Sequence, residues 1–494
     1  MSPSTLRQPL RPSAHPYLSG NYAPVHEEVT AVDLEVTGVV PDYLDGRYLR
    51  TGPNPLGDAD PAHYHWFLGD GMAHGMRLRD GKAQWYRNRW IRSAAVAAHL
   101  GEKWPGGGAR AGLDFAGNTN IVGHAGRTLV LTEGGMRPYE LTDELDTVGG
   151  SDFCGTLRRG YAAHPKRDPV TGELHAVSYN PMCGNRIQYT VTGIDGRVRR
   201  AVNIRLMSQT MMHDFSLTER YVVIYDMPVV LDLGAASSSR AVRAAAKPVN
   251  RLVSRFSAPD ALVRAVIRGS ERTRGGVTSM PYRWAPEKAA RIGLLPRDSA
   301  LPEDVTWFEV PQCYMFHPLN AYDDNGRVIL DVVRHPSVFT TGRRLFEPTS
   351  LDRWTVDLTT GRVSTHRIDD QVQEFPRVDE RRVSRKHRFG YTVNSVVTSD
   401  GAVPRAILRH DFETGDIRRV TFGDHDEPGE FVFVPAHEDA DEDDGVVMGF
   451  VYRGADDRSD LVLLDGRTLE TVGTVHVPVR VPHGFHGNWV PQAG

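Results

Sequence analysis

Four histidines stand in distinctive short motifs, and they are the residues of this chain best suited to metal chemistry. They occur as Ala-His164-Pro, Met-His213-Asp-Phe, Phe-His317-Pro-Leu-Asn-Ala-Tyr and Gly-Phe-His486-Gly-Asn-Trp. A neutral imidazole offers one nitrogen lone pair to a metal ion, and several transition metals accept it. The motifs are spread from residue 164 to residue 486, so no single helix or finger could unite them. If the four rings meet, the fold must radiate around one point.

The other histidines are interpreted as structural. The chain has 20 histidines in all. Three of them lie in one aromatic-rich segment: His63, His65 and His74. No further residue of matching type lies nearby to complete a metal site, so we assign this segment to a structural loop. His483 competes with His486 near the carboxyl end, but Gly484 and Gly487 would let the backbone approach closely around His486, which favours His486.

The elements expected to position these residues are strands. Apolar, β-branched stretches of strand length occur at 128–132, 221–225, 328–333, 446–452 and 461–464. Between such stretches a turn recurs in variants, as in Asp168-Pro-Val-Thr-Gly172, Asp357-Leu-Thr-Thr-Gly361 and Asp411-Phe-Glu-Thr-Gly415, with a related form at Asp465. An aspartate can bond its own backbone and glycine supplies a positive φ, so each predicts a β-hairpin. These features predict an all-β chain of repeated antiparallel sheets. A propeller is the leading candidate for its fold, and a double sandwich or separate β domains are the alternatives.

One segment breaks the strand pattern. Residues 235–274 are rich in Ala, Ser and Arg, and their apolar residues are spaced as in a helix. A basic amphipathic helix can lie on an anionic membrane surface. The alternative is a helical insertion that packs on the β body and exposes a solvated basic face.

Composition limits the remaining functions. The 494 residues carry a net charge of −4, so no global field favours nucleic acid. The three cysteines are widely separated and form no C-x-x-C, which argues against disulfides and thiolate zinc sites and suits a reducing cytoplasm. No run of about 18 apolar residues predicts a membrane span. Residues 1–25 lack the apolar core of a signal peptide and are expected to be a poorly structured extension.

Cofactors carried by phosphate groups have no support in the sequence. There is no Walker A motif, and the glycines of 104–108 neither follow a strand nor open an apolar helix. The acidic run 438–444 lacks the glycine and the glutamate that a calcium loop requires, so we interpret it as a solvated turn.

Short motifs along most of the chain resemble the carotenoid cleavage oxygenase family, which also includes stilbene-cleaving dioxygenases and a retinoid isomerase. They run in family order from about residue 40 to the end: Gly46-Arg-Tyr-Leu-Arg-Thr-Gly-Pro-Asn-Pro55, His65-Trp-Phe-Leu-Gly-Asp-Gly-Met72, Asn118-Thr-Asn120, Leu131-Thr-Glu133-Gly-Gly, Ala163-His164-Pro-Lys-Arg-Asp-Pro169, Met212-His213-Asp-Phe215, His317-Pro-Leu-Asn-Ala-Tyr322, Glu374-Phe-Pro-Arg377, Gly429-Glu430-Phe-Val-Phe-Val-Pro435 and Pro482-His-Gly-Phe-His486-Gly-Asn-Trp489.

The resemblance implies a fold and a metal site. The fold is one seven-bladed β-propeller over residues 1–494, with helical or loop insertions capping the iron-bearing face. Iron(II) would lie on the axis, and the ligands carry over to His164, His213, His317 and His486. Three glutamates that hold ligand rings in the family carry over to Glu133, Glu374 and Glu430. Carboxylates that accept the outer ring N–H fix the tautomer of each ring and offset the charge of the ion.

The activity implied is oxidative cleavage of a conjugated C=C bond by dioxygen, giving two carbonyl products without an external reductant. In stilbene-cleaving relatives a lysine commonly precedes the first glutamate, whereas this chain has Thr132 there. We therefore expect an apolar carotenoid or apocarotenoid substrate, with a stilbene-type substrate as the alternative and a non-catalytic binding scaffold as a third hypothesis. The sequence implies no obligate protein partner. It determines neither the double bond that is cleaved nor the oligomeric state.

Overall fold

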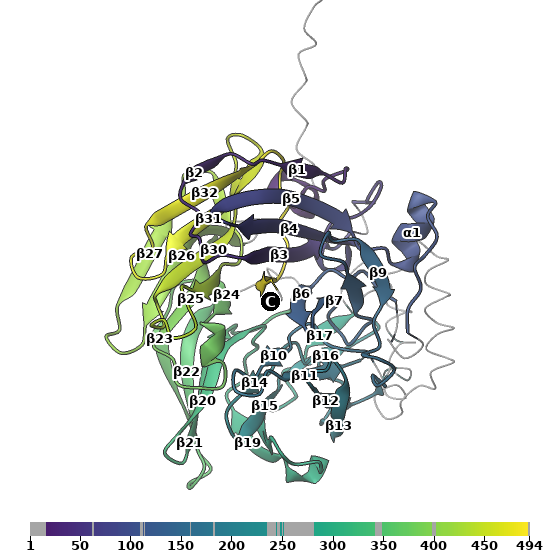
Figure 1. Ribbon diagram of the computed structural model, residues 1–494. Coiled ribbons are helices and arrows are strands. Elements are labelled where there is room, and N and C mark those ends of the chain that lie inside the picture. Colours follow the sequence, from purple (N-terminus) through teal and green to yellow (C-terminus); the bar gives the residue numbers. More distant parts are fainter. Residues whose placement is uncertain are drawn as a thin grey trace, which may run out of the picture.

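Seven antiparallel sheets surround a central axis in the computed structural model, which describes residues 16–61, 64–108, 112, 114–158, 160–180, 183–234, 244, 248, 250, 281–340, 348–397 and 402–492 (Figure 1). The sheets follow one another around the ring in chain order. The predicted seven-bladed β-propeller is therefore confirmed, whereas the sandwich alternative is wrong. Among the described residues, no helix combines the length and the apolar character needed to cross a membrane.

The sheets are numbered here from one to seven around the ring. The first sheet contains β1 (Thr30–Val32), β5 (Lys82–Trp90), β4 (Gly71–Arg79), β3 (Gly46–Pro53) and β33 (Gly487–Pro491), and the second contains β6 (Asn120–His124), β7 (Arg127–Leu131), β8 (Tyr139–Leu141) and β9 (Thr147–Gly150). The third sheet contains β10 (Lys166–Arg167), β11 (Leu174–Tyr179), β12 (Arg186–Thr192) and β13 (Val198–Arg205), and the fourth contains β14 (Ser216–Leu217), β15 (Tyr221–Asp226), β18 (Ala290–Pro296) and β19 (Thr306–Val310). The fifth sheet contains β20 (Pro318–Asp324), β21 (Arg327–Arg334), β22 (Ser350–Asp357) and β23 (Val363–Asp369). The sixth sheet contains β24 (Gln373–Arg377), β25 (Phe389–Val397), β26 (Ala402–Asp411) and β27 (Ile417–Thr421). The seventh sheet contains β28 (Asp426–Pro428), β29 (Val432–Pro435), β30 (Gly445–Arg453), β31 (Arg458–Asp465), β32 (Thr471–Val477) and β2 (Val36–Gly38).

Both ends of the described chain help to close the ring. The carboxyl-terminal β33 pairs with β3 in the first sheet, with Trp489 opposite Tyr48. The amino-terminal β2 pairs with β32 in the seventh sheet, with Thr37 opposite Thr474. Each of these two sheets therefore contains strands from distant parts of the sequence, and the backbone hydrogen bonds of two sheets join the ends of the ring.

The core lies between neighbouring sheets, which pack face to face. Strand β3 shows how fully an inner strand is enclosed: all eight of its residues are buried, including Arg47 and Arg50. Tyr48 packs in a cluster with Phe450 of the seventh sheet, and the next residue, Leu49, packs with Ile121 of the second sheet. Successive side chains on a strand point to opposite faces, so one inner strand serves two interfaces.

The predicted hairpin turns are confirmed. In three of them the first aspartate accepts hydrogen bonds from backbone N–H groups two and three residues later. Gly361, which ends the turn between β22 and β23, has a φ of 70°. The turn that begins at Asp465 makes the same hydrogen bonds, but Leu469 takes the left-handed position with a φ of 60°. The aspartate thus determines this turn even where glycine is absent.

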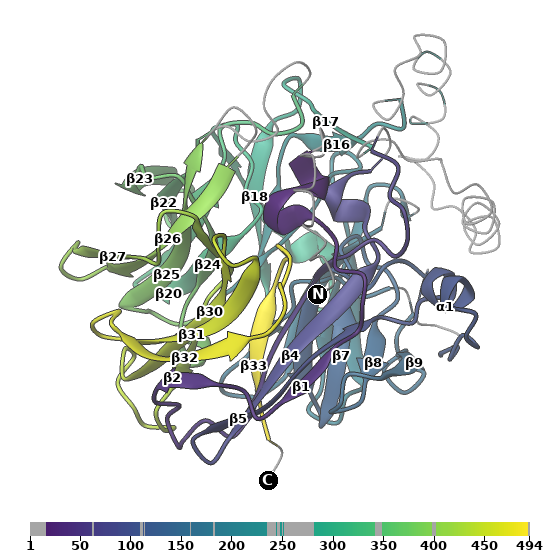
Figure 2. The same ribbon diagram turned by 90° about the horizontal axis from the view of Figure 1, so that it is seen from above.

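Short helical elements and one small sheet supplement the propeller. The 3-10 helices are η1 (Pro16–Leu18), η2 (Gly20–Tyr22), η3 (Trp66–Leu68), η5 (Pro302–Asp304) and η6 (Glu380–Arg382). Helix α1 (Ala94–Leu100) lies on the outside, and Ser93 caps it by accepting the N–H of Val96. Strands β16 (Val229–Leu231) and β17 (Tyr282–Trp284) form a two-stranded sheet toward one face of the ring (Figure 2).

Two predicted segments fall largely outside the described residues. The insertion expected at 235–274 lies outside the described residues except at three isolated positions. Its contact with a membrane stays a prediction. Of the extension expected at 1–25, residues 1–15 lie outside, whereas η1 and η2 belong to the described part and Asn21 is buried.

Buried neutral histidines within the sheets predict acid sensitivity. Burial, together with the charge of Arg297, lowers the pKa of His175 to about 3. The ring contacts the hydroxyl of Tyr189 at 2.7 Å. Because the folded-state pKa lies below the unfolded value, His175 is neutral in both states above about pH 6.5, and the unfolded state alone takes up the proton between pH 6.5 and 3. Stability should therefore fall with acidification by about 1.4 kcal/mol per pH unit for this one residue.

Urea unfolding of metal-free protein at pH 7 and pH 5 measures this effect. We expect His175→Gln to be less stable than the unsubstituted protein at pH 7 but to lose about 2 kcal/mol less between the two pH values. An equal loss in both proteins would contradict the assignment of a neutral, buried His175.

Candidate metal centre

The seven predicted site residues come from seven different sheets. Each of the four histidines lies one to three residues before an innermost strand: His164 before β10, His213 before β14, His317 before β20 and His486 before β33. The starts of these strands meet around the axis because the sheets repeat in one orientation. The ring geometry therefore gathers residues that are hundreds of positions apart.

The three glutamates come from the remaining three sheets. Glu133 follows β7, Glu374 is the second residue of β24, and Glu430 lies between β28 and β29. Every sheet of the propeller thus contributes one of the residues that the sequence singled out.

The structure brings the four imidazole rings together. Five pairs of their ring centroids are 4.5 to 5.2 Å apart. The Nε2 atoms of His213 and His317 are 3.2 Å apart. Candidate ligand atoms of His164, His213 and His317 all lie within 4.8 Å of one another, so this group could hold a metal ion. Its role as a ligand set remains a prediction.

Outer carboxylates contact each histidine. Nδ1 of His317 is 2.6 Å from Oε2 of Glu374, and Nδ1 of His486 is 2.9 Å from Oε1 of Glu430. Oε2 of Glu133 lies between two rings, 3.1 Å from Nε2 of His164 and 3.5 Å from Nδ1 of His213. In the His317 and His486 pairs the carboxylate accepts a hydrogen bond from Nδ1–H, which leaves the Nε2 lone pair for the centre of the cluster.

Burial and charge set the protonation of the cluster. Burial, reinforced by the neighbouring histidines, holds the pKa of His164 and His213 well below the ordinary value. Burial also lowers the pKa of His486. For His317 the charge and hydrogen bond of Glu374 outweigh burial, so its pKa is raised. Three of the four imidazoles are therefore held in the neutral, metal-binding form.

The three glutamates differ among themselves. Burial alone would raise the pKa of Glu374, but His317 and His335 bring it well below the ordinary value. His486 and Arg377 likewise outweigh burial and lower the pKa of Glu430 to about 2. Burial raises the pKa of Glu133 to about 8. A nearby cation would favour the ionised form of Glu133.

A divalent transition metal fits this arrangement. With Nδ1–H of His317 directed to Glu374, the Nε2 lone pair of His317 faces Nε2 of His213 at 3.2 Å. Two lone pairs at that separation repel each other unless a cation or a proton lies between them. Imidazole nitrogen donors suit iron, copper, nickel and zinc rather than magnesium or calcium.

An apolar cavity of about 320 Å³ reaches the cluster from one side. Its walls include His213, His317 and His486. The apolar and aromatic residues of the lining include Tyr22, Trp66, Phe67, Leu68, Phe115, Met136, Tyr179, Met211, Tyr282, Phe316, Phe375 and Phe485. Tyr22 of η2, Trp66 of η3 and Tyr282 of β17 show that the short elements on one face complete this cavity.

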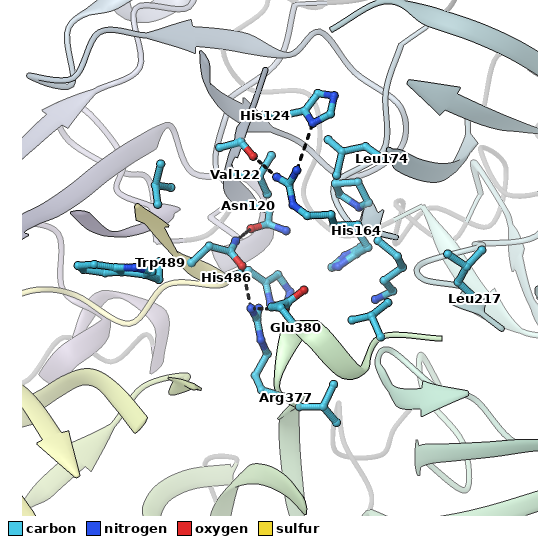
Figure 3. Close-up of a pocket in the computed structure, with 18 of the residues that line it drawn as sticks. Asn120, Val122, His124, His164, Leu174, Leu217, Arg377, Glu380, His486 and Trp489 are labelled. Carbon is cyan, nitrogen blue, oxygen red and sulfur yellow. Dashed lines mark hydrogen bonds and ion pairs between the residues drawn. The ribbon is translucent and has the colours of Figure 1, made fainter. Parts of the chain in front are cut away.

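A polar channel of about 580 Å³ reaches the same cluster along the inner strands. His164, His317 and His486 border it, and Figure 3 shows His164 and His486 beside Arg377 and Asn120. The charged residues of its lining include Arg47, Asp143, Lys166, Arg167, Asp214, Arg377 and Glu380. Several are paired within the wall, for example Lys166 with Asp214 at 2.8 Å. The cluster thus separates an apolar space from a polar one.

The choice of His486 over His483 agrees with the positions of the two rings. Nε2 of His483 is 2.6 Å from Oε2 of Glu427, outside the cluster. His65 caps η3 through the N–H of Phe67, and His74 contacts the hydroxyl of Tyr86, so both are structural as predicted. His63 lies outside the described residues.

Sequence reasoning missed His335, Phe375 and Arg377. His335 contacts Glu374, and Arg377 lies 3.5 Å from Glu430. Phe375 has a φ of 53° at an irregularity in the pairing of β24 with β25, and its ring stacks on His317. A bulge next to a site re-aims a side chain, here Glu374. Phe375 and Arg377 were within the Glu374-Phe-Pro-Arg377 motif, whereas the only signal for His335 was a His-Pro pair like that of His164.

Comparison with known proteins agrees with the fold and identifies the family. Residues 22–491 match the family model described as RPE65, retinal pigment epithelial membrane protein. The chain is 49% identical over 496 residues to the carotenoid cleavage oxygenase of Mycobacterium tuberculosis, covering 97% of this chain and 98% of the relative. It is 30% identical over 526 residues to carotenoid 9,10(9',10')-cleavage dioxygenase 1 of Arabidopsis thaliana, covering 96% and 90%.

Solved structures share the propeller. The crystal structure of Pseudomonas brassicacearum lignostilbene dioxygenase superimposes with a TM-score of 0.80 at 25% identity, covering 98% of this chain and all of that one. Cobalt-substituted Synechocystis apocarotenoid oxygenase gives a TM-score of 0.77 at 24% identity, covering 97% and 98%. The chain is thus a seven-bladed propeller of the oxygenase type. It belongs to the RPE65/carotenoid oxygenase family, as its sequence motifs predicted.

A divalent metal should stabilise the folded protein through the histidine cluster. A ligand that binds only the folded state adds about 4 kcal/mol at 1,000 times its Kd. We expect Co²⁺ added to metal-free protein to raise Tm by about 4 °C, because ΔTm is about 1 °C per kcal/mol for a chain of this size. His317→Ala should abolish most of that rise.

The matched control is His366→Ala, which removes an exposed histidine from β23 of the same sheet as His317. Its Co²⁺-dependent rise in Tm should equal that of the unsubstituted protein. An undiminished rise in His317→Ala would exclude the cluster as the metal site.

Proposed function

We propose that this protein is an iron(II)-dependent dioxygenase that cleaves a conjugated C=C bond of a carotenoid or apocarotenoid into two carbonyl products. The observation that carries the proposal is the position of the histidine cluster beside an apolar, aromatic-lined cavity, whose wall includes His213, His317 and His486. A metal there would meet an apolar substrate directly, without an intervening polar layer.

The proposed ligands are His164, His213, His317 and His486. Four imidazoles on a six-coordinate ion leave two positions open, which suits iron(II) oxygen chemistry. Iron(II) bound there would supply the redox-active centre that activates dioxygen for attack on the alkene. The outer glutamates orient the rings and offset the charge of the ion, and their loss in other metalloproteins costs 10–100-fold in metal affinity or activity.

Residues of the cavity would bind and orient the polyene. Aromatic faces such as Phe316 and Phe375 lie against the rings of His213 and His317, at centroid distances of 5.1 and 5.7 Å. They present flat apolar surfaces to a planar conjugated chain and exclude water from the reacting bond. The polar channel on the other side of the cluster offers a separate path for small polar molecules.

The overall reaction balances without a reductant. One C=C double bond and one O₂ molecule give two C=O groups, so both electrons and atoms are accounted for. No proton is transferred in that balance. This agrees with a site whose singled-out residues are imidazoles and carboxylates engaged with one another.

The carotenoid substrate is favoured over a stilbene by the residue at position 132. The hydroxyl of Thr132 accepts the N–H of Gly117 at 2.9 Å and donates to the carbonyl of Phe115 at 3.2 Å. It is therefore occupied by the backbone, and no amine is available there to engage a phenol. The relatives of 49% and 30% identity carry carotenoid cleavage in their names, which supports the same choice.

Isotope labelling with competing substrates tests this function. Iron-loaded protein incubated with a carotenoid, an apocarotenoid and a resveratrol-like stilbene under ¹⁸O₂ should convert the carotenoid or apocarotenoid to two aldehydes or ketones. Immediate borohydride reduction prevents exchange with water, and mass spectrometry should then find label in both products.

The alternatives give different results. Rapid cleavage of the stilbene with no polyene product would favour the stilbene hypothesis, and an unlabelled isomer of the substrate would indicate isomerase chemistry. Failure of the protein to bind iron, with His317→Ala equivalent to the unsubstituted protein, would favour a binding scaffold.

A further inference from the structure

His335 is a buried histidine in the wall of the apolar cavity. It directly follows β21 and is 1% exposed. Its backbone forms a reciprocal pair with Tyr314, whose N–H donates to the His335 carbonyl at 2.8 Å and whose carbonyl accepts the His335 N–H at 2.7 Å. The position of the ring is therefore fixed by main-chain hydrogen bonds as well as by packing.

Glu374 joins His335 to His317. Nε2 of His335 is 3.1 Å from Oε1 of Glu374, and Oε2 of the same carboxylate is 2.6 Å from Nδ1 of His317. Oε2 also accepts the backbone N–H of Phe375. One carboxylate thus bridges two imidazoles, and each of its oxygens has a separate partner. Since an ionised carboxylate only accepts, both facing ring nitrogens must carry the proton.

The outer partner of Glu374 differs in chemical type from that of Glu430. Glu430 is held by the guanidinium of Arg377 at 3.5 Å and by the N–H of Gly487 at 2.8 Å. Glu430 is thus held by a guanidinium and a backbone amide, whereas Glu374 is held by an imidazole ring and the backbone N–H of Phe375. Oε2 of Glu374 faces Nδ1 of His317 at 2.6 Å, and a carboxylate that accepts Nδ1–H raises the basicity of Nε2.

We propose that His335 is a positioning residue, which holds Oε1 of Glu374 so that Oε2 stays on His317 and makes that imidazole a stronger metal donor. The inference rests on the proposed function, because it assigns His317 to the metal. Without the His335 hydrogen bond, the Glu374 carboxylate could rotate about its terminal torsion. Its hydrogen bond to Nδ1 of His317 would then depend on the bulge at Phe375 alone.

A matched pair of variants separates hydrogen-bond donation from packing. His335→Gln keeps an N–H donor that can reach Glu374, whereas His335→Met has a similar length and flexibility but no donor. His387→Met is the control, because His387 is also buried and lies 3.2 Å from a carboxylate, that of Asp331, outside the cluster.

The measurements are Co²⁺ affinity by competition with a chromophoric chelator, the visible absorption band of the Co²⁺ protein, and Tm of the metal-free protein. We expect His335→Met to weaken Co²⁺ binding 10–100-fold and to shift the band, and His335→Gln to restore affinity to within about threefold. His387→Met should lower Tm while leaving Co²⁺ affinity and the band unchanged.

Two results would overturn the inference: Co²⁺ binding by His335→Met with unchanged affinity and spectrum, or equal losses in His335→Gln and His335→Met. If His335→Met does not fold, the test depends on His335→Gln. A loss of Co²⁺ affinity in His335→Gln would contradict a role of His335 as hydrogen-bond donor, because this variant keeps an N–H group. Failure of the unsubstituted protein to bind Co²⁺ would instead contradict the proposed function, so the two failures are distinguishable.

Discussion

The pairing of β33 with β3 closes the ring of seven sheets, and the position of every candidate site residue depends on that closure. His486 directly precedes β33, so the same strand that joins the ends of the ring also delivers the fourth imidazole to the axis. Because every sheet turns its inner edge to the same centre, one residue from each sheet is enough to build the cluster and its carboxylates. A metal centre of this kind cannot form in part of the ring.

Burial of several ionisable groups at that centre is tolerated because they are paired. Buried charges cost several kcal/mol unless hydrogen bonds and opposite charges compensate them. Glu374 is shared by two imidazoles, and Glu430 is held by Arg377 and the backbone, whereas Glu133 lies between the rings of His164 and His213 and its pKa is raised to about 8 by burial. The three carboxylates are chemically unequal, so the four rings around the axis are unequal donors.

Two spaces of different polarity reach the histidine cluster from different sides. Aromatic residues from short elements on one face enclose the apolar cavity, while charged side chains on the inner strands line the channel. Strand β3 serves both the core and the channel, because Tyr48 and Leu49 pack between sheets whereas Arg47 lines the channel. An apolar substrate and small polar molecules can therefore approach the same point from different sides.

The sequence by itself determined the local features and singled out the candidate site residues. An aspartate that bonds its own backbone determines a hairpin wherever it occurs, which is why the turns from Asp357 and Asp411 were predicted, and motifs of a few residues were enough to identify His164 and Glu374 as site candidates. Only the tertiary structure decided which side chains meet. Periodicity could not separate a propeller from a sandwich, because both bury alternating strands. His335 became visible only when β21 placed it against Glu374, 39 residues away in the chain, since such contacts depend on the packing of whole sheets and not on any local pattern.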